Sequence, residues 1–356
     1  MRLVFGALFF CLAWGTLTSA RAQPPVSYSD ANSGVFLRYL NAPEPGDDIT
    51  ESPFLALSLD GGETHRAIMD TGSTGIVVAA HSIPDFDNLP SLGPGKLTYT
   101  SSGRVMNGQW VSTTATIADA DGASIVTRPL PVLAVTEVTC LEDARDCTPD
   151  PDPRRVAMIG IGFAREGDRQ GQSTPDKNPF LNPDVGDRTL HQGYVVTREG
   201  VHVGLTAANT GGGFAYSKLQ RQETIEDWAA APMCVDVDDT PAGCGTILVD
   251  TGVTRMFLGL AEGSAPPMGD GGRLADGTKL AFYVPEKADS VARYSFTLGE
   301  DGNPLAPRAV ILTRPRAAAF VNTTVYFLNG FDYLFDAEAG YVAFRWTGHA
   351  LGATGQ

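Results

Sequence analysis

Short runs in which apolar residues alternate with other residues recur along the chain. Residues 54–59, 194–197 and 201–205 are examples, and turn-forming Asp and Gly residues follow the first run at 60–62. Strands that bury one face produce this alternation, and Gly-containing turns join them into hairpins. The pattern therefore predicts a mainly β protein. Helical periodicity is weak, and only residues 217–230 are expected to hold a short helix.

A polar stretch rich in Pro and Gly separates two halves that carry such runs. It extends from about Arg165 to His191 and holds three prolines. This composition is typical of a connection between compact units. An earlier polar segment is expected to contain one strand around residues 34–39. The predicted division is a signal peptide (1–22), a lead-in segment (23–49), an N-terminal lobe (50–165), a connection (166–191) and a C-terminal lobe (192–356).

The first residues have the layout of a secretory signal peptide. Arg2 precedes an apolar run from Leu3 to Leu17, and Ala20 and Ala22 would form the cleavage site. We therefore expect an exported protein, periplasmic or extracellular. No later stretch is long and apolar enough to span a bilayer, so no membrane span is expected.

The charge balance limits the expected partners. The formal net charge is −15, from 41 acidic and 26 basic residues. Nucleic acid and anionic membranes repel such a surface, so neither is expected to bind. Solubility outside the cell is the simpler explanation of the acidity, and we expect a monomer.

Four cysteines of the exported part lie in two close pairs. An exported chain with an even number of locally paired cysteines predicts two disulfides, Cys140–Cys147 and Cys234–Cys244. Zinc is the alternative, but these spacings do not fit a zinc motif and the five histidines are scattered. No metal and no cofactor are expected.

The triplet Asp-Thr-Gly occurs twice, at residues 70–72 and 250–252. Three apolar residues precede each copy, and another apolar run follows it. A buried strand can thus bring each Asp to the floor of a cleft, and Gly lets the other loop approach closely because it has no Cβ.

Two carboxyls held together cannot both ionise, so they share a proton and titrate as a pair. Such a dyad can deprotonate a water and protonate the far side of a peptide bond. Two structural turns are the alternative, and so is a cleft that kept its shape and lost its activity.

At these motifs the chain resembles the pepsin-like (family A1) aspartic peptidases. Residues 70–74 look like the N-terminal Asp-Thr-Gly-Ser-Ser of that family, and residues 250–254 look like its C-terminal Asp-Thr-Gly-Thr-Ser. Residues 97–103 resemble the flap hairpin that covers the cleft. Residues 158–163 are similar to the apolar-apolar-Gly segment that packs under the first catalytic loop.

The resemblance implies a bilobal β fold with an active-site cleft between two barrel-like lobes. It also implies an aspartic endopeptidase that acts on polypeptide substrates without a metal. Asp70 and Asp250 would be the catalytic pair. The supporting residues would be Thr71, Gly72, Ser73, Thr251 and Gly252, with the two threonines bracing the loops. The flap and substrate-binding residues would be Tyr99, Ser101 and Gly103.

The chain departs from the family pattern beside the second Asp. Val253 stands where the family has a hydroxyl, so Asp250 is expected to lack the donor that Ser73 gives Asp70. Residues 320–322 are the nearest match to the second apolar-apolar-Gly segment, which places Asn322 under the second loop.

Two further departures concern the flap and the start of the exported chain. Val77 replaces the Trp that supports the flap Tyr, and Trp110 is the candidate substitute. Only 47 residues separate Gln23 from Asp70, which leaves little room for a propeptide and favours a bacterial member. The departures support a second hypothesis beside the peptidase, namely a pepsin-fold binding protein with little or no turnover.

Overall fold

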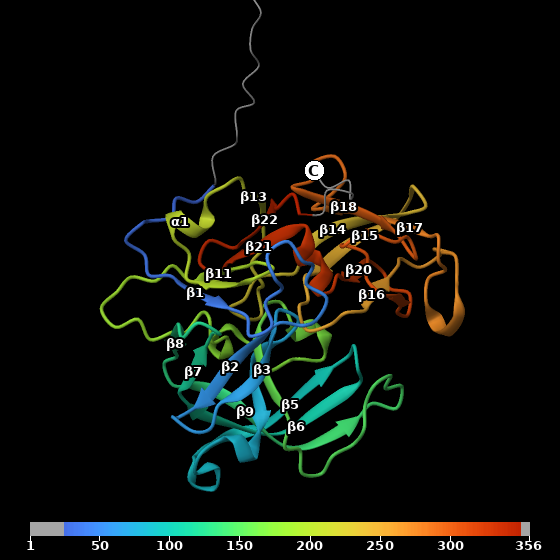
Figure 1. Cartoon of the computed structure of the whole chain (residues 1–356). Coiled ribbons are helices and arrows are strands. Elements are labelled where there is room, and N and C mark those ends of the chain that lie inside the picture. Colours follow the sequence, from blue (N-terminus) through green and yellow to red (C-terminus); the bar gives the residue numbers. More distant parts are fainter. Residues whose placement is uncertain (1–24, 350–356) are drawn as a thin grey trace, which may run out of the picture.

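The computed structural model describes residues 25–349, and the chain in that range is mainly β, with three sheets. The predicted signal peptide lies outside the described residues. Figure 1 shows the strands from β2 to β9 (blue to green) below those of the C-terminal part (yellow to red), whereas the blue strand β1 lies in the upper part beside β11. The mainly β prediction is therefore confirmed.

The first sheet has nine strands and curls into half a barrel (Figure 1). The order of its strands is β5-β6-β9-β4-β10-β3-β2-β7-β8. Their bounds are β2 (Phe54–Leu59), β3 (His65–Asp70), β4 (Thr74–Ala79), β5 (Ser91–Tyr99), β6 (Arg104–Thr113), β7 (Ala115–Ala118), β8 (Ser124–Val126), β9 (Leu130–Cys140) and β10 (Ala157–Ile161).

The second sheet has seven strands in the order β18-β17-β14-β15-β20-β16-β19. Their bounds are β14 (Ala231–Val237), β15 (Thr240–Leu248), β16 (Met256–Gly259), β17 (Lys279–Val284), β18 (Ala292–Thr297), β19 (Val310–Leu312) and β20 (Ala319–Asn322).

The third sheet has six strands in the order β1-β12-β11-β21-β22-β13 and joins the two ends of the described chain. Their bounds are β1 (Val35–Arg38), β11 (Gly193–Val196), β12 (Gly200–Val203), β13 (Ala215–Lys218), β21 (Phe331–Asp336) and β22 (Tyr341–Trp346). The strand expected around residues 34–39 is confirmed as β1. The division into lobes stays a prediction.

Helices within residues 25–349 are short. They are α1 (Ala207–Thr210) and the 3-10 turns η1 (Ala80–Ser82), η2 (Phe86–Asn88), η3 (Glu166–Asp168), η4 (Pro175–Lys177), η5 (Asp270–Gly272) and η6 (Val325–Asn329). No helix in that range has the length and apolar character that crossing a bilayer requires.

The helix expected at residues 217–230 is wrong, because tertiary contacts take the polar groups of this segment. The buried Asp227 carboxylate accepts hydrogen bonds from the backbone of Ala164 and of Trp228, both at 2.8 Å. The Trp228 indole donates to the Ala337 carbonyl at 2.7 Å. Contacts of this kind override a weak local preference for helix.

The first two sheets repeat one arrangement of three strands. β3 runs parallel to β10, which pairs antiparallel with β4. β15 likewise runs parallel to β20, which pairs antiparallel with β16. β4 is buried along its whole length, and apolar side chains from all three sheets form one continuous core. The two Asp-Thr-Gly triplets lie where β3 and β15 end, and buried apolar residues, Met69 in β3 and Ile247 and Val249 at the end of β15, anchor them there.

Both predicted disulfides are present, Cys140–Cys147 and Cys234–Cys244. Cys234 and Cys244 face each other on the neighbouring strands β14 and β15. Cys140 ends β9, and Cys147 closes the loop that follows.

Candidate active site

Thr71 and Thr251 join the two Asp-Thr-Gly loops. The Thr71 hydroxyl donates to the Val249 carbonyl at 2.6 Å and accepts from the Thr251 N–H at 3.0 Å. The Thr251 hydroxyl donates to the Met69 carbonyl at 2.8 Å and accepts from the Thr71 N–H at 3.1 Å. Both threonines are buried, so water does not compete for these bonds. The exchange is symmetrical and fixes one loop against the other.

This brace brings the two carboxyls together. A Cβ on Gly252 would lie 2.6 Å from Oδ1 of Asp70, and a Cβ on Gly72 would collide with the carboxyl of Asp250. Each carboxyl therefore lies against the glycine of the opposite loop. Asp70 and Asp250 are 3% and 6% exposed, so the pair is largely withdrawn from water.

Asp70 accepts two hydrogen bonds from its own loop. The Gly72 N–H donates to Oδ1 at 2.7 Å, and the Ser73 hydroxyl donates to Oδ2 at 2.5 Å. Hydrogen bonds donated to a carboxylate stabilise its ionised form. The place predicted for Ser73, beside the outer oxygen of Asp70, matches this geometry.

Asp250 also accepts two hydrogen bonds, and one of them corrects the sequence analysis. The Gly252 N–H donates to Oδ1 at 2.8 Å. The Val253 side chain has no N–H or O–H to donate, but the Asn322 side-chain amide donates to Oδ2. The expectation that this oxygen lacks a donor is therefore wrong, because a neighbouring strand supplies one.

The strand register explains the position of Asn322. Asn322 of β20 lies beside Leu248, two residues before Asp250. In the first half, Met158 of β10 lies beside Ile68, two residues before its Asp. Asn322 is thus the equivalent of Met158 in the first half. The match expected from the sequence pairs Asn322 with Gly160, which lies beside Asp70, so that pairing is wrong by two residues.

The environment of Asp250 favours its protonated form. Burial first, and the negative charge of Asp70 second, raise the pKa of Asp250 to about 8. The hydrogen bond from Asn322, the charge of Arg165 and the Gly252 N–H each lower that pKa and only partly offset the rise. Asp250 therefore holds its proton up to neutral pH and can serve as the acid of the pair.

Tyr99 lies at the end of the flap hairpin and faces the pair. It ends β5, which pairs with β6 across the turn at residues 100–103. Burial, and then the charge of Asp70, raises the pKa of Tyr99. Its hydroxyl is buried and has no hydrogen-bond partner among residues 25–349. The tip of the ring thus lies close to Asp70 and Ser73 and can still bond a group that enters the cleft.

Trp110 supports the flap through apolar contact and through a hydrogen bond to Gln172. Trp110, Val77 and Tyr99 belong to one cluster of apolar side chains. The Trp110 indole N–H donates to Gln172 Oε1 at 3.0 Å, and not to Tyr99. The same Gln172 oxygen accepts from the Lys96 N–H of β5 at 2.8 Å, so the indole is joined to the flap hairpin through Gln172.

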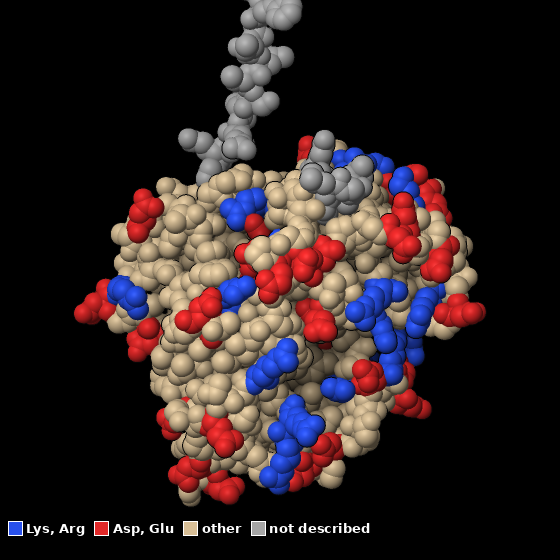
Figure 2. Space-filling model, viewed as in Figure 1, with Lys and Arg blue, Asp and Glu red and all other residues tan. Residues whose placement is uncertain are grey.

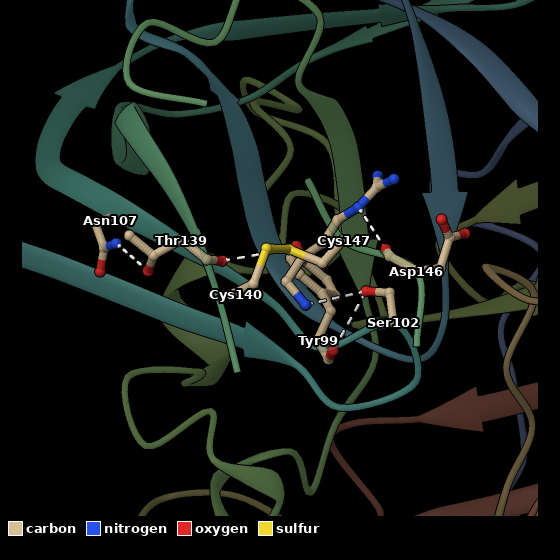
Figure 3. Close-up of a disulfide and its surroundings, with 8 residues drawn as sticks. Tyr99, Ser102, Asn107, Thr139, Cys140, Asp146 and Cys147 are labelled. Atoms are coloured by element: carbon tan, nitrogen blue, oxygen red, sulfur yellow. Dashed lines mark hydrogen bonds between the residues drawn. A yellow bond between two sulfur atoms is a disulfide. The ribbon is translucent and has the colours of Figure 1, made fainter. Parts of the chain in front are cut away.

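The turn of the flap is tied to the loop that the first disulfide closes (Figure 3). The Ser102 carbonyl accepts from the N–H groups of Arg145 and Asp146, both at 3.0 Å, and the Gly103 carbonyl accepts from the Leu141 N–H at 2.9 Å. Gly103 has a φ of +86°, and a Cβ there would lie 2.5 Å from the Cα of Ala144. Only glycine allows this contact.

Arg165 and Asp168 were not identified from the sequence. The Arg165 guanidinium, 5% exposed, donates to the Gly72 carbonyl at 2.7 Å and forms an ion pair with Asp168. Asp168 also accepts from the Thr100 hydroxyl of the flap turn, at 3.1 and 3.2 Å. This chain of contacts links the first Asp-Thr-Gly loop to the turn at residues 100–103. Nothing in the spacing around Arg165 signals a buried cation.

A cavity of about 380 Å³ opens over the pair. Residues of the first and second sheets line it together, among them Asp70, Tyr99, Ser101, Asp250 and Asn322. Within residues 25–349, no group of three or more His, Cys, Asp or Glu is placed to hold a metal ion.

No protein-family model matches this chain, and no curated protein matches it. The geometry of the site is therefore the ground on which a function is proposed.

Proposed function

We propose that the protein is an aspartic endopeptidase of the pepsin-like, bilobal kind, exported from the cell. The observation that carries this proposal is the close approach of the buried Asp70 and Asp250 carboxyls across the Thr71–Thr251 brace. Two carboxyls in different environments can serve as an acid–base pair, and burial and the charge of Asp70 raise the pKa of Asp250.

The residues support a direct attack of water on a peptide bond. Asp70 takes a proton from a water molecule as its oxygen bonds to the peptide carbon, and Asp250 gives its proton to the carbonyl oxygen. Asp70 then passes the proton to the amide nitrogen while Asp250 recovers one from the tetrahedral carbon's hydroxyl. The C–N bond breaks, and the pair again holds one proton.

The cavity suits an extended polypeptide. Its walls come from the flap hairpin on one side and from residues after the second triplet on the other. The free Tyr99 hydroxyl can bond the substrate backbone when the cleft is filled. A backbone held between the two sheets would bring its carbonyl carbon to the pair.

Cleavage of a reduced and alkylated protein at about pH 4–7 tests the proposal. The purified chain should cleave it, a statine-type inhibitor should block cleavage, and Asp70→Asn or Asp250→Asn should each remove nearly all turnover. Asp236→Asn changes a buried carboxyl outside the cavity and is the matched control. Peptide binding by a stable wild-type chain without cleavage would support the binding-protein hypothesis instead.

A further inference from the structure

A second cavity, of about 320 Å³, adjoins the one over the carboxyl pair. Both cavities are lined by Thr100 and Ser101 of the flap turn and by Asn322, which bonds Asp250. An extended chain advances about 3.3–3.6 Å per residue. A peptide bound over the pair would therefore reach the second cavity within a few residues of the bond to be cut.

Arginines dominate the charge of this second cavity. Its lining includes four arginines and two aspartates, which gives a formal charge of 4 − 2 = +2. The four are Arg145, Arg169, Arg314 and Arg316, and all four are exposed. The whole chain has a formal charge of −15. Figure 2 shows Lys and Arg side chains gathered around a hollow near the middle of the face in view.

The two aspartates leave most of this positive charge unbalanced. Asp168 is engaged by Arg165, outside this lining. Asp143 lies 3.9 Å from Arg314, but the two side chains are 71% and 93% exposed, and such a pair contributes little. Among residues 25–349, no carboxylate forms an ion pair with Arg145, Arg169 or Arg316.

Aromatic rings position two of these guanidinium groups. The guanidinium of Arg145 lies 5.7 Å from the centre of the Phe257 ring, and that of Arg316 lies 4.8 Å from the centre of the Phe320 ring. An arginine held by a ring face keeps its N–H edge free, and that edge matches both oxygens of a carboxylate. Phe257 and Phe320 also line the cavity.

We propose that this cavity is a subsite for the acidic side chains of a polypeptide, with Arg145 and Arg316 as the recognising residues. The proposal rests on the proposed peptidase function and adds the substrate class: chains with Asp or Glu a few residues from the scissile bond. An acidic protein repels such chains over most of its surface, so the positive cavity orients them within the cleft.

A set of matched peptides tests the subsite. A single Glu is moved through the positions near the scissile bond, and each peptide has a partner with Gln at that position. At about pH 5.5 a Glu side chain is ionised. At the best position, kcat/KM should favour Glu about five- to tenfold. The preference should shrink at high salt and disappear below about pH 4, where Glu is protonated.

The variants then assign the preference to residues. Arg145→Gln with Arg316→Gln should bring the Glu/Gln ratio close to one. Arg293→Gln, which changes an exposed arginine over the Tyr283 ring outside both cavities, should leave the ratio as it is. A ratio near one in the wild type, or one that survives the double substitution, would overturn the subsite while leaving the peptidase intact.

Binding separates the two proposals. Fluorescence anisotropy with the same peptides, on wild-type protein and on Asp70→Asn, measures Kd without turnover. Arginine-dependent preference for Glu in binding, without cleavage by the wild type, would support the subsite and reject the peptidase. Absence of both cleavage and Glu-selective binding would reject both.

Discussion

The hydrogen bond from Asn322 to Asp250 influences the alkaline limb of the profile of kcat/KM against pH, and its removal should shift that limb in a predictable direction. The amide is 6% exposed and donates to Oδ2 of Asp250. This donor favours the carboxylate and lowers the pKa of Asp250, which nevertheless stands at about 8. Asn322→Leu removes the donor at similar volume, so the pKa of Asp250 should rise further.

The magnitude follows from the strength of one such bond. A hydrogen bond to a charged group contributes about 1.5 kcal/mol, and 1.36 kcal/mol corresponds to about one pKa unit. The active form carries one proton on the pair, and loss of that proton from Asp250 gives the alkaline limb. The alkaline limb should therefore move up by about one pH unit, while the acid limb should stay in place because the Asn322 amide donates to Asp250.

The assay is kcat/KM against pH on one peptide, for the wild type, Asn322→Leu and the control Asn107→Leu. Asn107 is a half-buried amide of β6 that bonds Thr139 and does not line the cavity. Val253 occupies the place that Ser73 has in the first loop, so adding Val253→Thr to Asn322→Leu should supply a new donor and return the limb. An alkaline limb that stays in place, or moves to lower pH, in folded Asn322→Leu would refute the reasoning.

Three further predictions concern the frame of the site. Gly72→Ala places a methyl group against the carboxyl of Asp250 and should remove nearly all turnover. The control Gly171→Ala has open space around the new methyl group and should keep its turnover, and circular dichroism must show that both variants are folded. Replacing Cys140 and Cys147 by Ser opens a short loop and should lower the free energy of unfolding, measured in urea, by about 2.5 kcal/mol. The same change should raise KM, because the flap turn is hydrogen-bonded to that loop, and an unchanged KM would contradict this role of the loop. His191→Gln should lower Tm more at about pH 5 than at about pH 9. Burial lowers the pKa of His191, but the bond to Asp336 outweighs burial and raises that pKa, so the stabilisation is lost as pH rises through the pKa of His191. Burial raises the pKa of Asp336, but the bond from His191 outweighs burial and lowers that pKa, so the stabilisation is also lost in strong acid. Equal losses of Tm at both pH values would show that the ion pair does not carry the effect.

The features predicted correctly from the sequence are those that depend on residues close together in the chain. Alternating runs gave β2, β11 and β12 nearly to the residue, and close cysteine spacing gave both disulfides. Each Asp-Thr-Gly triplet lies at the end of a strand, as the apolar runs around it indicated. These features depend on periodicity and on residues near one another in the chain.

The sequence was least informative where contacts join distant segments. Asn322 reaches Asp250 across 72 residues, and Arg165 reaches Gly72 across 93. Such contacts depend on strand register, and a shift of two residues along β20 gave Asn322 the wrong equivalent. The helix predicted at residues 217–230 failed for a related reason, because polar groups of this segment bond loop residues far away in the chain, Ala164 and Ala337.

The attachment of the flap to the disulfide loop has a consequence for the order of events in a catalytic cycle. The flap turn cannot lift alone unless it breaks the three backbone hydrogen bonds to residues 141–146, so hairpin and loop should move as one lid. Arg145 belongs to that lid and lines both cavities. An acidic side chain seated on Arg145 would thus hold the lid down until the chain is cut, and departure of the fragment that carries it would be the step that reopens the cleft.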